Sequence, residues 1–472
     1  MSVGSFSGNG TGRSRRVGGG RLEFLVPHLL RGQLLRPGFV RMSLRLGVAQ
    51  QMPSWAKLQF TNAGVDPRDL ERVLGRISSL PSWVDEWEKL ARDHEQTARE
   101  ARDQGRRAEA TREFLAASAA YNFAQYVMFL DIARKRALHD ACIGAYAEAA
   151  PLLEPPATRF EVTFRRKPIT GYLRVPPGPR PVPVAVLFNG TNAVKEEMHW
   201  WSEALLERGI ATLQFDGPGM GQTFYRLSMV AEPRPVGVAI LNRIEAHPEL
   251  DPHAVAFLGM SLGGYLAIRM ATHDRRVKAV AAVSPPYSAD IYWNVTLAAL
   301  RHELAALYGI EEREMAKVID KITLADVLAD LRCPLMVSGG GHDLITPGSE
   351  AWRIFEGASC ERELVFYPRG AHDCFNVMAD LRPRMVSWLS DQLARHRSAP
   401  RWTAGRAEMD GDPGWTAAEA VDPDFADALS GDITPRQWNR RDEAGRPVKW
   451  GWPWSRVNGV EVVHRQAPAE FS

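Results

Sequence analysis

Apolar residues change their spacing along the chain, and each change predicts a different kind of structure. Between about residues 53 and 156 they recur every three or four positions, as Trp83, Trp87 and Leu90 do, which is typical of helices with one buried face. Between residues 157 and 396, short apolar runs alternate with helical stretches. This alternation is typical of a mostly parallel, doubly wound α/β sheet. The pattern therefore predicts an all-helical N-terminal domain (53–156) followed by an α/β domain (157–396).

The apolar runs of the α/β domain are the expected strands. The first two, 159–164 and 169–175, are close in sequence and are expected to form an antiparallel pair that opens the sheet. Six further runs are expected to continue it, at 182–188, 210–215, 254–258, 277–283, 335–339 and 364–367. Residues 293–331 add helices between two of these strands, where a lid over an active site is commonly found.

The two ends of the chain follow neither pattern. Residues 1–52 are rich in Gly, Ser and Arg, so we expect a disordered basic leader, with an organellar transit peptide as the alternative. Residues 397–472 are rich in Gly, Pro and Asp but contain Trp402, Trp415, Trp438, Trp450, Trp452 and Trp454. Disordered segments are usually poor in tryptophan. We therefore expect part of this Trp-rich extension, for example residues 450–454, to dock on the body or to bind a partner.

The composition limits the possible partners and location. Hydrophobic residues make up 45% of the chain and charged residues 24%, with a formal net charge of +2. This balance gives no reason to expect a nucleic acid or a membrane surface as partner. Four cysteines, with neither the density of a disulfide framework nor the spacing of metal ligands, indicate a reducing, cytoplasmic location.

The most informative motif lies where an expected strand meets an expected helix. The run 254–258 leads into Gly259-Met260-Ser261-Leu262-Gly263, which matches the pattern G-x-S-x-G. Such a sharp turn holds the serine in a strained conformation, and the glycines prevent clashes between side chains. The serine hydroxyl then stands at the tip of the sheet, above the positive end of the helix. The motif predicts Ser261 as a nucleophile.

A serine nucleophile needs a base that takes its proton and an acid that orients the base. In this kind of fold the partners follow the serine in the order acid, then histidine, each after a strand. Asp343 follows the run 335–339 in a glycine-rich loop, and His372 follows the run 364–367. Each alone could be an ordinary turn or loop residue. Together, in this order, they predict an Asp343–His372 pair that serves Ser261.

Other residues of these loops have smaller expected roles. His342 and Asp373 adjoin the predicted pair, but neighbouring loop residues seldom aim at one point, so neither is expected to act. The backbone N–H groups of Leu262 and Thr191 are expected to stabilise the negative charge that develops on the substrate oxygen. Asp216 is expected to brace its own glycine-rich loop.

Aromatic residues are the candidates for substrate contact. Most aromatic residues of the helical domain are expected to pack between helices, whereas Tyr121 and Tyr126 are candidates to face a ligand. In the α/β domain, Tyr292 and Trp293 are the corresponding candidates.

Several of these segments resemble one branch of the α/β-hydrolase family. This branch includes 2,6-dihydroxypseudooxynicotine hydrolases, fungal polyketide-shortening hydrolases and the esterase-like fermentation–respiration switch proteins. The resemblance covers roughly residues 80–396. It depends on Val194-Lys195-Glu196-Glu197, Asp216-Gly217-Pro218-Gly219-Met220-Gly221-Gln222, Gly259-Met260-Ser261-Leu262-Gly263-Gly264, Ala289-Asp290-Ile291-Tyr292-Trp293, Gly341-His342-Asp343 and Gly370-Ala371-His372-Asp373-Cys374.

The resemblance implies a helical cap over the triad, hydrolysis without a metal or an organic cofactor, and a homodimer. We expect a serine hydrolase that cleaves a small aromatic or polyketide-like substrate through an acyl-enzyme, at a C–C bond next to a ketone or at an ester. A general carboxylesterase is an alternative, because a triad serves several leaving groups. A catalytically inactive regulator that binds a protein partner is the third hypothesis.

Overall fold

The computed structural model describes residues 42, 44–52, 54–126, 131–290, 298–397, 439–441, 447–449 and 460–465. Most of the expected leader and of the Trp-rich extension lies outside this part of the chain. Tyr292, Trp293 and residues 450–454 also lie outside it.

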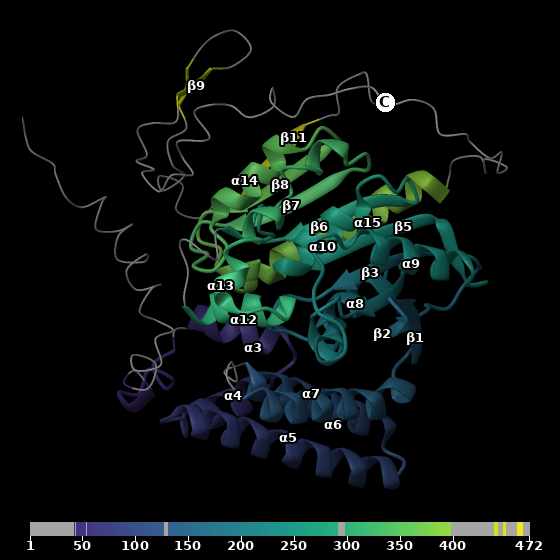
Figure 1. Ribbon diagram of the computed structural model, residues 1–472. Coiled ribbons are helices and arrows are strands. Elements are labelled where there is room, and N and C mark those ends of the chain that lie inside the picture. Colours follow the sequence, from purple (N-terminus) through teal and green to yellow (C-terminus); the bar gives the residue numbers. More distant parts are fainter. Residues whose placement is uncertain are drawn as a thin grey trace, which may run out of the picture.

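A nine-stranded sheet forms the centre of the molecule, in the order β1-β2-β4-β3-β5-β6-β7-β8-β11 (Figure 1). Neighbouring strands from β4 to β8 are parallel, whereas β1, β2 and β11 pair antiparallel. The strands are β1 Ala157–Phe164, β2 Lys167–Arg174, β3 Val182–Phe188, β4 Ala211–Phe215, β5 Leu250–Met260, β6 Val277–Val283, β7 Leu335–Gly340, β8 Arg362–Tyr367 and β11 Glu461–Arg465. The expected mostly parallel sheet and its antiparallel opening pair are both confirmed.

Helices cover both faces of this sheet. Along β3, Val184 and Val186 pack into the hydrophobic core on one face, whereas Ala185 and Leu187 pack into that on the other, because side chains of a strand alternate. The first core also contains residues of α9 Arg234–Glu245, α10 Leu262–Ala271 and α14 Gly348–Gly357. The second contains residues of α8 His199–Leu206 and α15 Met378–Arg397. Two further helices, α12 Ala298–Tyr308 and α13 Glu312–Met315, lie in the expected lid region.

Five helices of the described N-terminal part form a layer beside the sheet domain, which we call the helical cap (Figure 1). They are α3 Ser54–Asn62, α4 Pro67–Leu74, α5 Leu80–Asp103, α6 Arg107–Gln125 and α7 Ile132–Ala149. The starts of α4 and α5 follow from local chemistry. The Asp66 side chain accepts a bond from the Arg68 N–H ahead of Pro67, and Ser79 and Ser82 bond each other's backbone at the start of α5.

Closely packed aromatic rings hold the helical cap together. The Phe60 ring lies 5.5 Å from that of Trp87 and 4.6 Å from that of Phe123, between centroids. The indole N–H of Trp83 donates to the Phe123 carbonyl at 2.9 Å. Leu44 is also buried in this cluster, so the packed helical region begins upstream of the boundary expected at residue 53.

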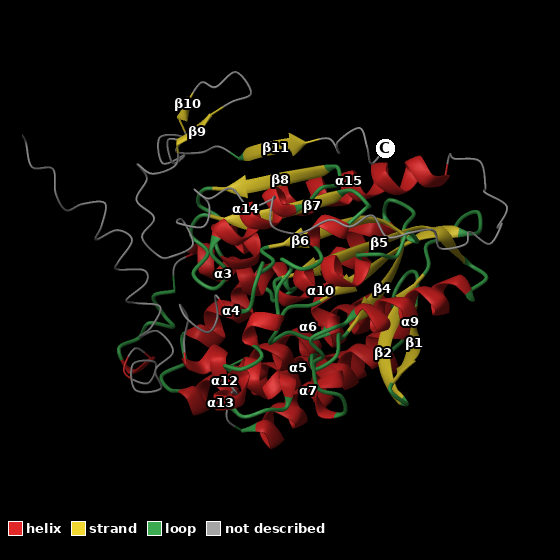
Figure 2. Cartoon of the chain, turned by 45° about the horizontal axis from the view of Figure 1, so that its top comes forward, coloured by secondary structure: helices red, strands yellow, loops and turns green. Residues whose placement is uncertain are grey.

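The C-terminal extension contributes one strand to the sheet. Strand β11 pairs with β8 at the sheet edge (Figure 2), and Val463 packs against the core there. Arg465 forms an ion pair with Glu356 at 2.8 Å. The part of the extension seen to dock is therefore β11. Across the described ranges, no helix combines the length and the apolar character that crossing a bilayer requires.

Candidate active site

Ser261 occupies a strained turn between β5 and α10. Its φ of 49° and ψ of −122° lie in a region that side-chain-bearing residues rarely adopt, and the residue is buried. The turn requires glycine on both sides. A Cβ atom at Gly259 would lie 2.1 Å from the Gly263 carbonyl oxygen, and one at Gly263 would lie 2.3 Å from the Asn189 carbonyl oxygen. The G-x-S-x-G spacing is thus a packing requirement of this turn.

Asp343 and His372 form a hydrogen-bonded pair in the loops after β7 and β8. His372 Nδ1 lies 2.9 Å from Asp343 Oδ2 and 3.0 Å from Oδ1. Asp343 Oδ1 also accepts bonds from the backbone N–H groups of Ile345 and Thr346, each at 2.8 Å. The same carboxylate therefore bonds both the turn and the His372 ring.

Backbone contacts bring these loops to the same edge of the sheet. The N–H groups of Gly341 and His342 donate to the carbonyls of Tyr367 and Gly370, each at 2.9 Å, which joins the loop after β7 to the loop after β8. The β3 loop meets the Ser261 turn, because a Cβ atom at Gly190 would lie 3.6 Å from the serine Cβ. The carboxyl ends of parallel strands share one edge, and the site forms there.

Asp373 contacts the opposite side of the His372 ring, which the sequence does not predict. Asp373 and Cys374 both have left-handed backbones, with φ of 53° and 54°. This conformation turns the Asp373 side chain back, so that its Oδ2 lies 3.5 Å from His372 Nε2. The Asp373 side chain therefore does contact the ring of its neighbour His372. Nothing in the residue types signals the two left-handed positions.

Burial makes Asp373 unusual. Desolvation raises its pKa to about 7, a rise that His372 opposes and that Asp343 and Glu197 reinforce, and the nearby Ser261 backbone N–H acts to lower it. Its Oδ1 has no hydrogen-bond partner among the described residues. The other neighbour, His342, is half-buried, and desolvation lowers its pKa.

The candidate oxyanion groups belong to the residue after Ser261 and to the β3 loop, whose Gly190 approaches the serine. Leu262 is the first residue of α10, and N–H groups in the first turn of a helix have no partner within it. Thr191 follows Gly190 in the β3 loop. The next residue, Asn192, is fixed by the helical cap: its side chain bonds Lys135 and the Tyr126 carbonyl. The cap thus positions the loop that carries Thr191.

Asp216 joins two loops beneath the site. It accepts bonds from the Gln222 N–H at 3.0 Å, within its own loop as expected, and from the Lys195 N–H at 2.8 Å. The Lys195 ammonium, fully buried, lies 3.2 Å from Asp216 and 2.8 Å from Glu196, and these carboxylates raise its pKa against the effect of burial. Asp216 therefore fixes the start of the segment that follows the Thr191 loop.

The candidate aromatic residues occupy different places. The Tyr126 hydroxyl donates to Glu197 at 2.6 Å, beside the Asn192 loop, and Asn122 donates to the same carboxylate at 2.9 Å. Burial raises the pKa of Glu197 despite these two bonds. The Tyr121 hydroxyl instead donates to Glu95, between α6 and α5, at 3.0 Å. Tyr126 is thus near the site, whereas Tyr121 bonds within the cap.

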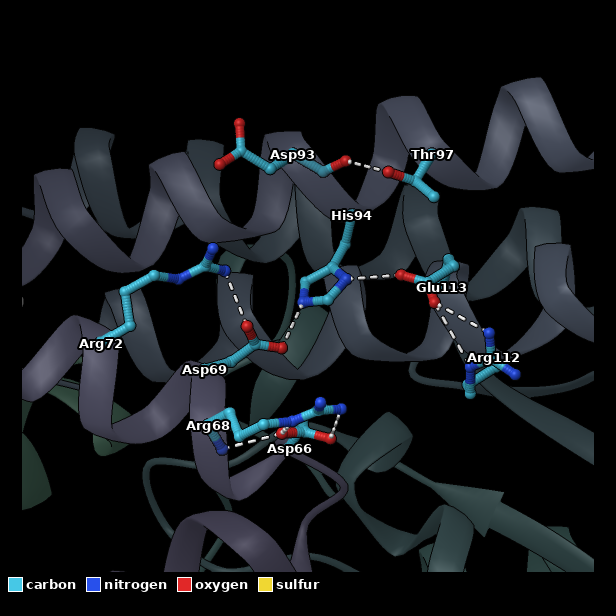
Figure 3. Close-up of polar contacts among 9 residues, drawn as sticks. All are labelled: Asp66, Arg68, Asp69, Arg72, Asp93, His94, Thr97, Arg112 and Glu113. Carbon is cyan, nitrogen blue, oxygen red and sulfur yellow. Dashed lines mark hydrogen bonds and ion pairs between the residues drawn. The ribbon is translucent and has the colours of Figure 1, made fainter.

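A second group of titratable residues surrounds His94 in the helical cap (Figure 3). His94 lies between Glu113, at 2.7 Å from Nδ1, and Asp69, at 3.1 Å from Nε2. These residues border a cavity of about 1080 Å³ between the cap and the sheet domain, and the described residues lining it do not include Ser261. Within the described ranges, no group of His, Cys, Asp and Glu has an arrangement that could hold a metal ion.

The sheet, its flanking helices and the strained serine turn define the chain as an α/β-hydrolase. A family model described as "Esterase FrsA-like" matches residues 49–300, and one described as "Acetyl xylan esterase (AXE1)" matches residues 236–392. The chain belongs to the FrsA-like esterase family. It is therefore a hydrolase or esterase.

Individual relatives agree with this assignment. The chain is 29% identical to 2,6-dihydropseudooxynicotine hydrolase of Paenarthrobacter nicotinovorans, over 73% of this chain and 92% of the relative. A crystal structure of 2,6-dihydroxy-pseudo-oxynicotine hydrolase superposes with a TM-score of 0.67 at 27% identity, covering 73% of this chain and 98% of that one. The hydrolase pyiE of Pyricularia grisea is 31% identical over 48% of this chain and 54% of its own length.

Proposed function

We propose that the chain is a serine hydrolase that cleaves an acyl bond of a small molecule through an acyl-enzyme. The observation that carries the proposal is the Asp343–His372 pair, at 2.9 Å, on the same sheet edge as the strained Ser261 turn. A serine at this kind of turn with a carboxylate-oriented histidine is the arrangement that activates a hydroxyl for acyl transfer.

Each residue has a defined part in the proposed reaction. Ser261 Oγ attacks the carbonyl carbon while His372 Nε2 takes the hydroxyl proton, and Asp343 keeps the other ring nitrogen protonated. The N–H groups of Leu262 and Thr191 bind the oxygen that becomes negative. His372 then returns the proton to the leaving group, and water attacks the acyl-enzyme by the same route.

The proposed substrate is a small aromatic or polyketide-like compound, cleaved at a C–C bond next to a ketone or at an ester. Similarity to 2,6-dihydropseudooxynicotine hydrolase over most of the chain supports the first kind of bond. A buried polar group beside the site, Tyr126 with Glu197, could bind a polar substituent of such a compound. Tyr121, Tyr292 and Trp293 remain predicted substrate contacts.

A general carboxylesterase is the second candidate, and the match of residues 236–392 to an acetyl xylan esterase model favours it. The two candidates differ in leaving group. We expect a panel of aryl esters and β-diketones to separate them, with Ser261→Ala as the inactive control. Diketone cleavage supports the first, and fast ester turnover with intact diketones supports the second. Turnover that survives in Ser261→Ala contradicts both.

The proposal includes a homodimer in the cytoplasm. Cys142, Cys333, Cys360 and Cys374 are all buried and free, as suits a reducing compartment. The β8 edge of the sheet is already paired with β11, so a dimer would use another surface. Light scattering after gel filtration tests the oligomeric state, and a monomeric mass contradicts this part of the proposal.

A further inference from the structure

The proposed mechanism leaves one buried carboxyl without a part. Asp373 is 93% buried, with an exposed fraction of 7%, and its Oδ2 lies 3.5 Å from His372 Nε2. That nitrogen must accept the Ser261 proton in the proposed reaction. The other carboxyl oxygen of Asp373, Oδ1, is enclosed by protein and has no hydrogen-bond partner among the described residues. A buried ionisable group without a full set of hydrogen bonds costs stability, so its presence beside the proposed catalytic histidine needs an explanation.

The surroundings of Asp373 are mainly acidic. Asp343 from the β7 loop and Glu197 from the segment before α8 both raise its pKa, whereas His372 is the cation that lowers it. Within the described part of the chain, Asp373 also raises the pKa of the Tyr126 hydroxyl, just after α6, and of the Cys374 thiol next in the chain. His372 is therefore the group through which Asp373 acts on the site.

We propose that Asp373 is a positioning residue that acts through His372: in the free enzyme its carboxyl faces Nε2 and competes with the Ser261 hydroxyl for that nitrogen. The inference rests on the proposed serine hydrolase function. His372 then lies between two carboxyl groups, Asp343 on Nδ1 and Asp373 on Nε2. Only the imidazolium form donates to both. An ionised Asp373 thus favours the protonated ring, which cannot act as base.

The contact also gives Asp373 a role during turnover. We expect a bound substrate to bring the Ser261 hydroxyl against His372. The contact between Asp373 and His372, at 3.5 Å, then breaks first. The Asp343 bonds to the same ring, at 2.9 and 3.0 Å, remain. The ring therefore keeps its orientation while its base nitrogen is released. Asp373 in this way sets the pH below which the free enzyme is inactive.

The direct test is the titration of His372 by NMR of ¹⁵N-histidine-labelled protein, with His372→Gln to assign its signals. Removing the negative charge in Asp373→Asn should move the His372 titration midpoint to lower pH by about one unit. The acid limb of kcat/KM for an aryl ester should move by the same amount. At a pH below the midpoint, reaction with a fluorophosphonate should accelerate up to about tenfold.

Matched variants separate this role from a general charge or structural effect. Asp380→Asn removes a carboxylate from the nearby start of α15, where it accepts the Tyr367 hydroxyl bond at 2.6 Å, and should leave the His372 midpoint unchanged. An equal shift in both variants overturns the proposal, and so does an unchanged midpoint in Asp373→Asn. If Asp373→Asn does not fold, Asp373→Ser is titrated in its place. If neither variant folds, the His372 signals of the wild type decide. A ring coupled to Asp373 titrates in two steps and supports the proposal, whereas a ring that titrates in one step overturns it.

The NMR result does not depend on catalysis. A wild-type protein whose Ser261 resists fluorophosphonates contradicts the proposed function, while the NMR midpoints still decide whether Asp373 controls the His372 ring. A labelled Ser261 with identical midpoints contradicts the Asp373 proposal alone.

Discussion

Among the described residues, two histidines lie between pairs of carboxylates, and they differ in what surrounds them. His94 of α5 contacts Glu113 of α6 at 2.7 Å and Asp69 of α4 at 3.1 Å (Figure 3). His372 contacts Asp343 at 2.9 Å and Asp373 at 3.5 Å. The partners of His94 come from regular helices, whereas those of His372 come from loops at the carboxyl edge of the sheet.

The difference bears on the proposed role of His372 as a base. Both nitrogens of His94 are occupied at short distance, and Arg72 binds the Asp69 carboxylate at 2.7 Å, so the group cross-links three helices. His372 is held firmly on one side only. Its other side faces the long contact to Asp373. Two short contacts immobilise the His94 ring, whereas one short and one long contact suit the base role that we propose for His372.

The largest expected effect is that of Ser261→Ala. Removing the hydroxyl should lower kcat by several powers of ten, because no covalent intermediate can form. Stability should change little, since the strained turn depends on its glycines. Turnover of an active aryl ester, with circular dichroism as the check on folding, measures this. Activity within tenfold of the wild type would assign the chemistry to another residue.

Asp343→Asn should have the next largest effect, a fall of about 10³–10⁴-fold in kcat, because the amide no longer fixes the ring tautomer. His94→Gln is its counterpart in the cap. A nearly silent Asp343→Asn would mean that a different acid orients His372, and Asp373 would be the first residue to test.

Asp373→Asn should raise stability, and more so at pH 8 than at pH 5. Burial raises the pKa of Asp373 to about 7, so the folded protein binds a proton that the unfolded chain loses above about pH 4. The contribution of Asp373 to the free energy of unfolding of the wild type therefore falls by about 1–3 kcal/mol as pH rises from about 4 to 7. Urea unfolding of both proteins at the two pH values measures the gain. An equal change at both would show that the carboxyl titrates normally.

His94→Gln should have the smallest effect on activity, less than about twofold in kcat, with a loss of about 1–2 kcal/mol in stability from the broken contacts. The measurement is urea unfolding beside ester turnover. A loss of kcat comparable to that of Asp343→Asn would show that the cap histidine takes part in the reaction, and the contrast between the two regions would then be wrong.

Much of the framework follows from local sequence. The runs 182–188 and 277–283 correspond to β3 and β6 without change, because strands buried on both faces read as continuous apolar segments. The order of Ser261, Asp343 and His372 was enough to predict that the last two would meet, and their hydrogen bond agrees. These features depend on short segments whose neighbours in the sheet are fixed by topology.

Other features depend on contacts that no local pattern contains. The left-handed backbone at Asp373 and Cys374 reverses the direction of a side chain, and neither residue type marks it. Strand β11 lies beyond the Trp-rich segment and pairs with β8, far back in the chain, through backbone bonds that any residues could make. The bond of Tyr121 to Glu95 likewise depends on how α5 and α6 are rotated against each other.

The central claim is that the Ser261 hydroxyl is the nucleophile, and a mapped covalent adduct tests it most directly. The 472-residue protein is treated with a fluorophosphonate at pH 8, digested and analysed by tandem mass spectrometry, with Ser261→Ala and His372→Ala in parallel. We expect one adduct, on Ser261, which is absent from Ser261→Ala and forms far more slowly in His372→Ala. A folded wild-type protein with no adduct at Ser261, or with equal labelling in His372→Ala, would contradict the account.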